Sequence, residues 1–291
     1  MDDPRRLGQV LLLPALLLIG LLLLLPIAST VITSLHIDTP FAPKRFVGLQ
    51  NYAQLRDDPV ARGTIEFTIL FVTVSVALEI LLGLIFALFI HHRFRGRGLV
   101  RASVLVPWAI PTVVAAVMWK YMLNDQYGFI NLLLHGGHIE SYRAYLADPG
   151  GARFAIILAD VWKTSSFAAL LILAGLQAIP DELYEAARVD GAGPIRTFFF
   201  ITLPLLRPAI LVALLFRIMD AFRVFDLVYV MTQGAPGGAT QVLQFFGYQK
   251  MFPEQQFGYG SAVSVVVFII VAIFSLLTVR LLGSRIFEES S

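Results

Sequence analysis

The sequence of 291 residues contains no cysteine and few charged residues. Without cysteine the chain cannot form disulfides, thiolate metal sites or a cysteine nucleophile. Charged residues make up 14% of the chain and hydrophobic residues 57%, whereas a soluble domain carries about 25% charged residues. A soluble enzyme could not bury this much apolar surface, and a disordered chain would have the opposite composition. The composition therefore indicates a membrane protein.

An excess of charge of either sign is also missing. Lys and Arg number 22 against 20 for Asp and Glu, so the net charge of +2 does not point to nucleic acid or to an acidic partner. No GxxxxGK[ST] pattern is present, and this chain is not expected to bind a nucleotide phosphate itself. We find no internal repeat and no second soluble domain, which predicts a single transmembrane domain over residues 1–291.

Four intervals crossed by at most one ionisable side chain are long enough for a membrane-spanning helix, which needs about 20 apolar residues, and two more are interrupted by charged residues. The first interval runs for 29 residues, from Leu7 to Leu35, and is too long for the apolar region of a signal peptide. We expect Pro14 and Pro26 to kink it. The prediction is an all-α membrane protein with six transmembrane helices over residues 8–34, 67–90, 102–122, 154–178, 208–231 and 256–280.

Basic residues in the short loops predict the orientation, because Lys and Arg accumulate on the cytoplasmic side. The loop 91–101 contains Arg93, Arg95, Arg97 and Arg101 and no acidic residue. If this loop is cytoplasmic, the order of the helices places both termini and the segment 180–207 in the cytoplasm as well.

The segment 180–207 is expected to fold as helix, break, helix. Pro180 can open the first helix, and Gly191 can end it because glycine accepts a left-handed conformation. Pro194 can start a second short helix. Glu185 and Arg188 are three residues apart, so one face of the first helix would present a paired acid and base. On composition alone, the default interpretation of the segment is an ordinary amphipathic connector at the headgroup level.

A longer spaced pattern in the same segment resembles the E-A-A-x3-G-x9-I-x-L-P coupling motif of binding-protein-dependent ABC importers. Every fixed position of that motif is met. The resemblance implies that this segment contacts a cytoplasmic ATPase, with Glu185 paired to a basic residue there. The implied coupling residues are Glu185, Ala186, Ala187, Asp190, Gly191, Ile201, Leu203 and Pro204.

Nearly the whole chain is similar to the carbohydrate permease subunits of the maltose, trehalose and glycerol-phosphate type, in their first-subunit branch. The similarity rests on Pro14-Ala-Leu, on the stretches 46–52 and 160–164, and on Ala221-Phe-Arg-Val-Phe-Asp226. It implies the six-helix core of a type I ABC importer permease. The sequence lacks the additional N-terminal helices and the large outer domain of some maltose permeases, so the implication is confined to that core.

The resemblance also implies a set of partners in a bacterial or archaeal cell membrane. These are a second membrane subunit of different sequence, two copies of an ATPase that hold ATP and Mg, and an extracytoplasmic sugar-binding protein. The substrate would be a disaccharide such as trehalose or maltose. This chain would carry no cofactor and no catalytic residue.

In the fifth expected span Arg217, Asp220, Arg223 and Asp226 recur at every third residue with alternating sign. Four charges facing lipid would cost about 10 to 14 kcal/mol, which excludes lipid exposure. Either these residues form mutually neutralised pairs that dock the helix, or some of them line the transport pathway. The candidate pathway residues are Phe222, Arg223, Phe225, Asp226, Tyr229, Asp160 and Lys163.

The polar residues of two other spans allow the same two interpretations. Asp160 and Lys163 in the fourth span either pair structurally with the fifth span or contribute to a sugar site. For Glu79 in the second span, a buried hydrogen bond is favoured over ligand contact. His135 and His138 have the spacing of a metal pair, but no other ligand accompanies them and no metal is expected.

Three other functions fit parts of the sequence. A glycerol-phosphate importer would use Arg217 or Arg223 to receive the phosphate, although the intervening aspartates favour a neutral sugar. A passive channel explains the polar spans and leaves the coupling segment without a role. An intramembrane enzyme would need a nucleophile and a base at membrane depth, and the buried charges are Arg, Lys and Asp without a suitable His or Cys.

Overall fold

The structure is a computed structural model that describes residues 4–92 and 94–280. Arg93, which was used to predict the orientation, and the chain ends 1–3 and 281–291, which were predicted to be cytoplasmic, lie outside the described residues. The chain forms two compact units. One unit contains the chain up to Arg62 together with Phe246–Phe268, and the other contains Gly63–Phe245 together with the residues from Ile269 onward.

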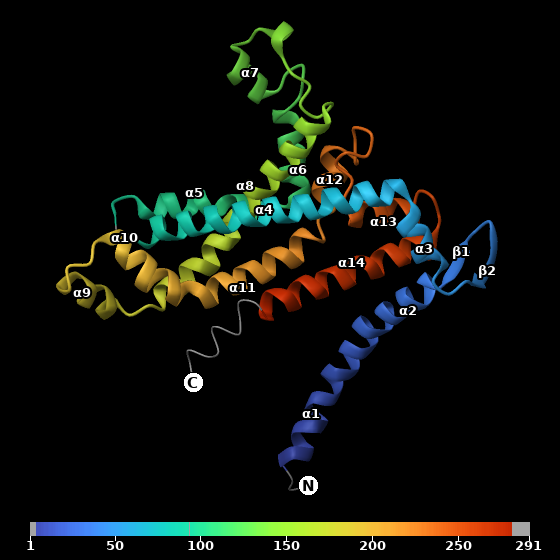
Figure 1. Ribbon diagram of the computed structural model, residues 1–291, viewed down its shortest axis with the longest axis horizontal. Helices are drawn as coiled ribbons and strands as arrows, with labels where there is room; N and C mark the ends of the chain where they lie inside the picture. Colours follow the sequence, from blue (N-terminus) through green and yellow to red (C-terminus); the bar gives the residue numbers. More distant parts are fainter. Residues whose placement is uncertain (1–3, 93, 281–291) are drawn as a thin grey trace. The chain divides into compact units, whose positions relative to one another are not determined.

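The first unit begins with a long apolar helix made of three consecutive pieces. These are α1 (Pro4–Ile19), a π-helical turn (Gly20–Leu24) and α2 (Leu25–Ser34), drawn in dark blue in Figure 1. The π turn lies just before Pro26, which has no N–H to donate within the helix. The most apolar 18-residue window within Leu12–Ser34 is 0% buried inside the structure, so its leucines are left for lipid or a partner chain.

A hairpin and a short helix complete the N-terminal part of this unit. Strands β1 (His36–Thr39) and β2 (Ala42–Phe46) pair antiparallel with His36 opposite Phe46. The buried Asn51 of α3 (Gln50–Asp57) donates to the carbonyl oxygens of Ser34 and His36, at 2.7 and 2.9 Å. One side-chain amide therefore joins the end of α2 to the hairpin.

The second unit contains most of the helices, and their bounds follow the chain. They are α4 (Pro59–His91, from Gly63 on), α5 (Arg97–Ala109), α6 (Thr112–Met122), α7 (Phe129–His135), α8 (Pro149–Gln177), α9 (Asp181–Val189), α10 (Pro194–Thr197), α11 (Leu203–Ala221), α12 (Asp226–Met231), the start of α13 (Leu243–Met251) and the end of α14 (Phe257–Thr278). A 3-10 turn (Ile139–Ser141) follows α7, and a π turn (Phe198–Thr202) joins α10 to α11.

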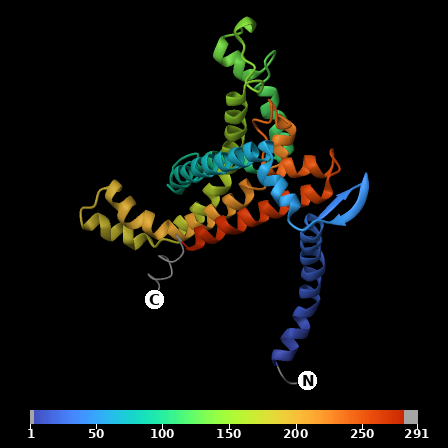
Figure 2. The same cartoon turned by 45° about the vertical axis from the view of Figure 1, so that its right-hand side comes forward.

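Helix α8 is the centre of the second unit. Its most apolar window is 67% buried, against 17% to 33% for the windows of α4 and α11. Small residues allow the close packing: a Cβ added at Gly83 of α4 would collide with Ala168, and one at Gly175 would collide with Ala209 of α11. The core cluster of buried apolar residues includes Ile90, Ile172, Leu173, Leu176 and Leu206. Figures 1 and 2 show α8 crossing between α5 and α11.

Two spans differ from the sequence prediction. The third span, expected to run without interruption over residues 102–122, is broken into α5 and α6 with a bend of 98°. Pro111 has no N–H, and it disfavours the helical conformation at Ile110, whose backbone is extended. Within residues 4–92 and 94–280, five helices are long and apolar enough to cross a membrane, or six if this bent pair is one span.

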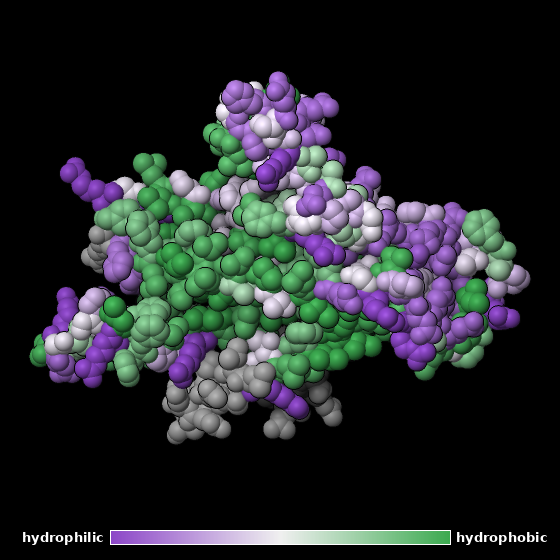
Figure 3. All heavy atoms as spheres, turned by 45° about the horizontal axis from the view of Figure 1, so that its top comes forward, coloured by the Kyte–Doolittle hydropathy of each residue, from purple (hydrophilic) through white to green (hydrophobic). Residues whose placement is uncertain are grey.

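The fifth span is displaced along the sequence. It was expected at residues 208–231, but the continuous apolar helix covers Pro194–Ala221. A turn follows, and α12 then starts at Asp226 in a new direction. Figure 3 shows broad hydrophobic areas on the visible face and hydrophilic residues gathered into separate patches, as expected when spanning helices face lipid.

Candidate functional site

The segment around Glu185 folds as helix, break, helix, as its sequence predicts. Helix α9 follows Pro180 and ends at Val189, and Gly191 has a φ of +74°. The amide of Ala192 donates to the carbonyl of Ala187 at 2.8 Å, and the amide of Gly191 donates to that of Arg188 at 3.1 Å. This pair of bonds is a Schellman ending, which glycine favours because it requires the left-handed conformation.

The predicted acid and base pair on α9 is confirmed. The guanidinium of Arg188 lies 3.8 Å from the carboxylate of Glu185, and both side chains are about 70% exposed. Next to them, Ala186 is exposed while Ala187 is buried. Helix α9 thus presents a charged face and one small side chain outward.

The second half of the motif lies where the segment enters the membrane helix. Ile201, Leu203 and Pro204 are half-buried in the π turn and the first turn of α11. The hydroxyl groups of Tyr184 and Thr202 are 3.2 Å apart, so a hydrogen bond connects α9 to the start of α11. A displacement of α9 would therefore act directly on α11.

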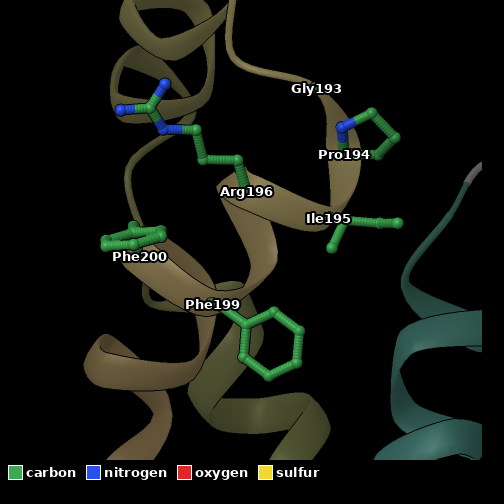
Figure 4. A pocket seen from close by; sticks show the side chains of 6 residues that line it. All are labelled: Gly193, Pro194, Ile195, Arg196, Phe199 and Phe200. Atoms are coloured by element: carbon green, nitrogen blue, oxygen red, sulfur yellow. The ribbon is translucent and has the colours of Figure 1, made fainter.

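A shallow hollow of about 480 Å³ lies in the middle of the segment, over α10 and the π turn. Figure 4 shows its six lining residues, with the guanidinium of Arg196 above the ring of Phe200, 5.9 Å from the ring centroid. Ile195 and Phe200 are each 75% exposed. This arrangement of a cation among apolar side chains was not anticipated from the sequence.

The main polar feature within the spans is a buried cluster around Arg217. Its guanidinium donates to both carboxylate oxygens of Glu79, at 2.5 and 3.1 Å, and to Asp220 at 2.5 Å. Asp160 lies 3.5 Å away. Arg217 and Glu79 have exposed fractions of 2% and 0%, so the bidentate geometry satisfies two charges that water does not reach.

For Glu79 and Asp160, the sequence left open a choice between structural pairing and ligand contact, and this cluster shows structural pairing. Glu79 makes the buried hydrogen bonds expected of it, and Thr164 donates to it at 2.8 Å. Asp160 pairs with Arg217 across α8 and α11, as the structural interpretation of Asp160 predicted. The pairing of Glu79 with Arg217 was missed, although a lone carboxylate in an apolar span requires a cation in some other span.

The ladder of alternating charges does not continue beyond Asp220. Helix α11 ends at Ala221, and the exposed side chains of Arg223 and Asp226 make no ion pair among the residues that the structure describes. Of the two interpretations left open for the ladder, mutual pairing is therefore not seen for Arg223 and Asp226 in the described part. Side chains three residues apart meet only within one continuous helix, and α11 has ended before Arg223.

The predicted aromatic residues separate into two groups. Phe222 is 1% exposed and packs against Phe274, so it belongs to the packing and not to an open wall. Phe225 and Tyr229 stack with ring centroids 5.4 Å apart and an interplanar angle of 19°. Tyr229 is 41% exposed, and Phe245 lies behind both rings.

Lys163 contacts a different part of the second unit. Its ammonium group donates to the carbonyl of Trp108, at the end of α5, over 3.3 Å. Among the described residues no group of three potential metal ligands is found, and His135 contacts the ring of Tyr142. No local signal in the sequence connects Lys163 with the break in the third span.

The comparisons with known proteins agree with the fold and with the motif. The family model described as binding-protein-dependent transport system inner membrane component matches residues 79–288. The trehalose/maltose transport system permease protein MalF of Thermococcus litoralis is 44% identical over 276 residues, which cover 94% of this chain and 93% of that protein. The sulfoquinovosyl glycerol transport system permease protein SmoG of Agrobacterium fabrum is 42% identical over 266 residues, with coverages of 91% and 86%.

A solved structure shares the fold at low sequence identity. It is the crystal structure of a bacterial ABC transporter involved in the import of alginate, with a TM-score of 0.83, 21% identity, and coverage of 96% of this chain and 95% of that chain. The fold is thus that of a type I ABC importer permease, and the predicted resemblance is confirmed. The chain belongs to the family of inner-membrane components of binding-protein-dependent transport systems, the permease subunits of ABC importers.

Proposed function

We propose that this chain is a pathway subunit for the import of a disaccharide of the trehalose or maltose type. The observation that carries the proposal is α9, an exposed helix with a Schellman ending that is joined to α11 by the bond between Tyr184 and Thr202. Such a helix can transmit a push from a soluble partner to a membrane helix. The choice of sugar follows the printed activity of a relative with 44% identity.

The partners in this proposal are those of a binding-protein-dependent importer. A second membrane subunit would complete the pathway, an ATPase pair with its ATP and Mg would close beneath α9, and an extracytoplasmic binding protein would deliver the sugar. The segment 180–207 and both chain ends would then face the cytoplasm. The exposed carboxylate of Glu185 suits a basic residue of the ATPase, and Ala186 allows its surface to approach closely.

Within the chain, Asp226 and Tyr229 are the best candidates for sugar contact. Tyr229 and Phe225 offer an apolar ring face to the sugar, while the exposed carboxylate of Asp226 can accept hydrogen bonds from hydroxyl groups. Asp160 is committed to Arg217 in the buried cluster, and we assign it to the support of the pathway.

The test is sugar-stimulated ATP hydrolysis by the complex reconstituted with its partners in lipid vesicles. Glu185→Ala should lower the stimulation at least about 10-fold, as expected for a lost charge-assisted contact. Gly191→Asp should lower it as well, because the φ of +74° at the end of α9 favours glycine. Glu182→Ala is the matched control, since Glu182 is an exposed acid on the same helix outside the motif. Stimulation that survives in both motif variants would contradict the coupling role.

A second candidate substrate is an anionic glycoside or a glycerol phosphate. Arg223 is exposed and makes no ion pair among the described residues, and one relative carries sulfoquinovosyl glycerol in its name. Trehalose, maltose, sulfoquinovosyl glycerol and glycerol 3-phosphate should be compared in the same assay. If only the anionic substrates stimulate ATP hydrolysis, and Arg223→Gln abolishes that effect, the second candidate replaces the first.

A further inference from the structure

One stretch of α8 contacts both arms of the broken third span. On the α5 side, Ser166 donates to the carbonyl of Val104 at 2.5 Å, and Phe167 stacks on Trp108 with ring centroids 5.5 Å apart. On the α6 side, Trp162 meets Trp119 edge to face at 5.9 Å. The two arms are therefore held from the same stretch of a buried helix.

Lys163 lies between these contacts on α8, and its side chain reaches the backbone at the break between α5 and α6. In a continuous helix the carbonyl of Trp108 would accept a hydrogen bond from the amide of residue 112, and the extended backbone at Ile110 removes that donor. The ammonium group of Lys163 donates to this carbonyl instead, at 3.3 Å. A cation at the C-terminal end of a helix is also favoured by the helix dipole.

A second lysine makes the same kind of contact at the C-terminal end of α12. Lys120 of α6 donates to the carbonyl of Val230 over 3.2 Å. Val230 belongs to the last turn of α12. The carbonyl groups of a last helical turn receive no hydrogen bond from an N–H group of the same helix. Lys120 thereby ties the end of α6 to the end of α12.

The two lysine contacts connect α8 to α5 and α6 to α12. Lys163 fixes the end of α5 and hence the corner from which α6 departs. Lys120, on α6, fixes α12. Helix α12 starts at Asp226 and carries Tyr229, the two residues assigned above to sugar contact.

We propose that Lys163 and Lys120 are positioning residues, which hold the wall formed by α12 by capping the open carbonyl ends of α5 and α12. Lys163 then supports the pathway and does not touch the sugar. The part that concerns sugar rests on the proposed function, whereas the capping of the two helices does not. Because the two lysines act at different breaks, each can be tested separately.

The geometry can be measured with spin labels, because the chain contains no native cysteine. Labels on cysteines placed at Leu99 and Tyr121, which are 78% and 59% exposed, report the angle between α5 and α6. Each arm contributes about 15 Å of helix, so the bend of 98° gives a backbone separation of about 20 Å, against about 30 Å for a straight helix. The protein should be labelled in the assembled complex in nanodiscs.

Lys163→Met should broaden this distance distribution toward the longer separation, since methionine keeps the length of the side chain and loses the donor. Lys163→Gln retains a donor and should stay closer to the wild type, and it also serves if the Met variant does not fold. Lys44→Met is the control, because Lys44 pairs with Asp38 in the hairpin region of the other unit. An unchanged distribution in Lys163→Met would overturn the capping role.

Sugar dependence supplies the second readout. In the ATPase assay, Lys163→Met should raise the half-saturating sugar concentration about 10-fold with the maximal rate nearly unchanged, and Lys120→Met should raise it about 3-fold. Wild-type distances combined with weaker sugar binding in Lys163→Met would show direct sugar contact and overturn the proposal. Altered distances with unchanged sugar dependence would overturn the link to the sugar wall. If no sugar stimulates the wild type, the proposed function fails while the label distances still test the capping.

Discussion

The charges of α9 and the charges around Arg217 differ in almost every physical respect. On α9 the side chains of Glu185 and Arg188 are about 70% exposed and 3.8 Å apart. Arg217 and Glu79 are almost fully buried and make a bidentate contact. An exposed pair contributes little to stability and remains free to bind a partner, whereas a buried pair holds helices together and is costly to break. The exposed charges of α9 are therefore available to a partner, as the proposed coupling role requires, whereas the buried charges hold helices together.

The largest test of this contrast is Arg217→Ala. The substitution leaves the fully buried Glu79 without its cation and should cost about 3 to 5 kcal/mol of stability. Thermal unfolding of the protein in detergent, followed by circular dichroism, measures the loss. Arg188→Ala is the matched control on α9 and should change the midpoint very little. Equal losses in the two variants would contradict the contrast.

Thr164→Val tests a smaller part of the buried cluster. The variant keeps the shape of the side chain and removes the hydroxyl that donates to Glu79 at 2.8 Å. Because the carboxylate stays buried, we expect a loss of about 1 to 3 kcal/mol in the same unfolding experiment. Thr30→Val, at a hydroxyl on the exposed first span that donates to Pro26, should cost clearly less. A neutral Thr164→Val would show that the hydroxyl is dispensable.

Gly191→Ala tests how much the stability of α9 depends on its Schellman ending. The φ of +74° is strained for alanine, and we expect about 1 kcal/mol of lost local stability. Amide hydrogen exchange across α9 measures the effect. Gly193→Ala provides the comparison, since its φ is −73° and an added Cβ would meet nothing within 4 Å. Exchange that accelerates equally in both variants would argue against a role of the left-handed ending.

The smallest effect is expected for the exposed pair itself. A double-mutant cycle with Glu185→Gln and Arg188→Gln should give a coupling of about 0.2 to 0.5 kcal/mol, read from hydrogen exchange in α9. The coupling should fall further at high salt, because the pair is exposed to screening. A coupling above about 1 kcal/mol would place these charges in the same class as the Arg217 cluster.

The features that could be predicted from the sequence are those with a local physical cause. Pro180, Gly191 and Pro194 each impose a backbone preference within one or two residues, and the helices of the coupling segment begin and end where those preferences put them. The apolar intervals likewise predicted most spans, because lipid requires a continuous helix of sufficient length. Whether the predicted coupling and pathway residues perform those roles remains a prediction, to be tested by the experiments above.

The features that could not be predicted depend on contacts between distant residues. No proline or glycine lies between Phe222 and Met231, so nothing local marks the turn that separates α11 from α12. Glu79 and Arg217 are 138 positions apart, and their pairing follows from helix rotation and depth. The break at Pro111 was visible in principle, but prolines also occur inside spanning helices, as at Pro14. A proline alone does not distinguish a kink from a right-angle bend.

The bidentate contact of Arg217 also limits how the protein can move. If α4 slid along α11 by one helical turn, about 5.4 Å, Glu79 would leave the guanidinium and remain as an isolated charge in a dry interior. The ion pairs that α4, α8 and α11 share oppose sliding of this kind, so these helices are expected to move together and not past one another. The cluster thus fixes the register of α4, α8 and α11 along one another.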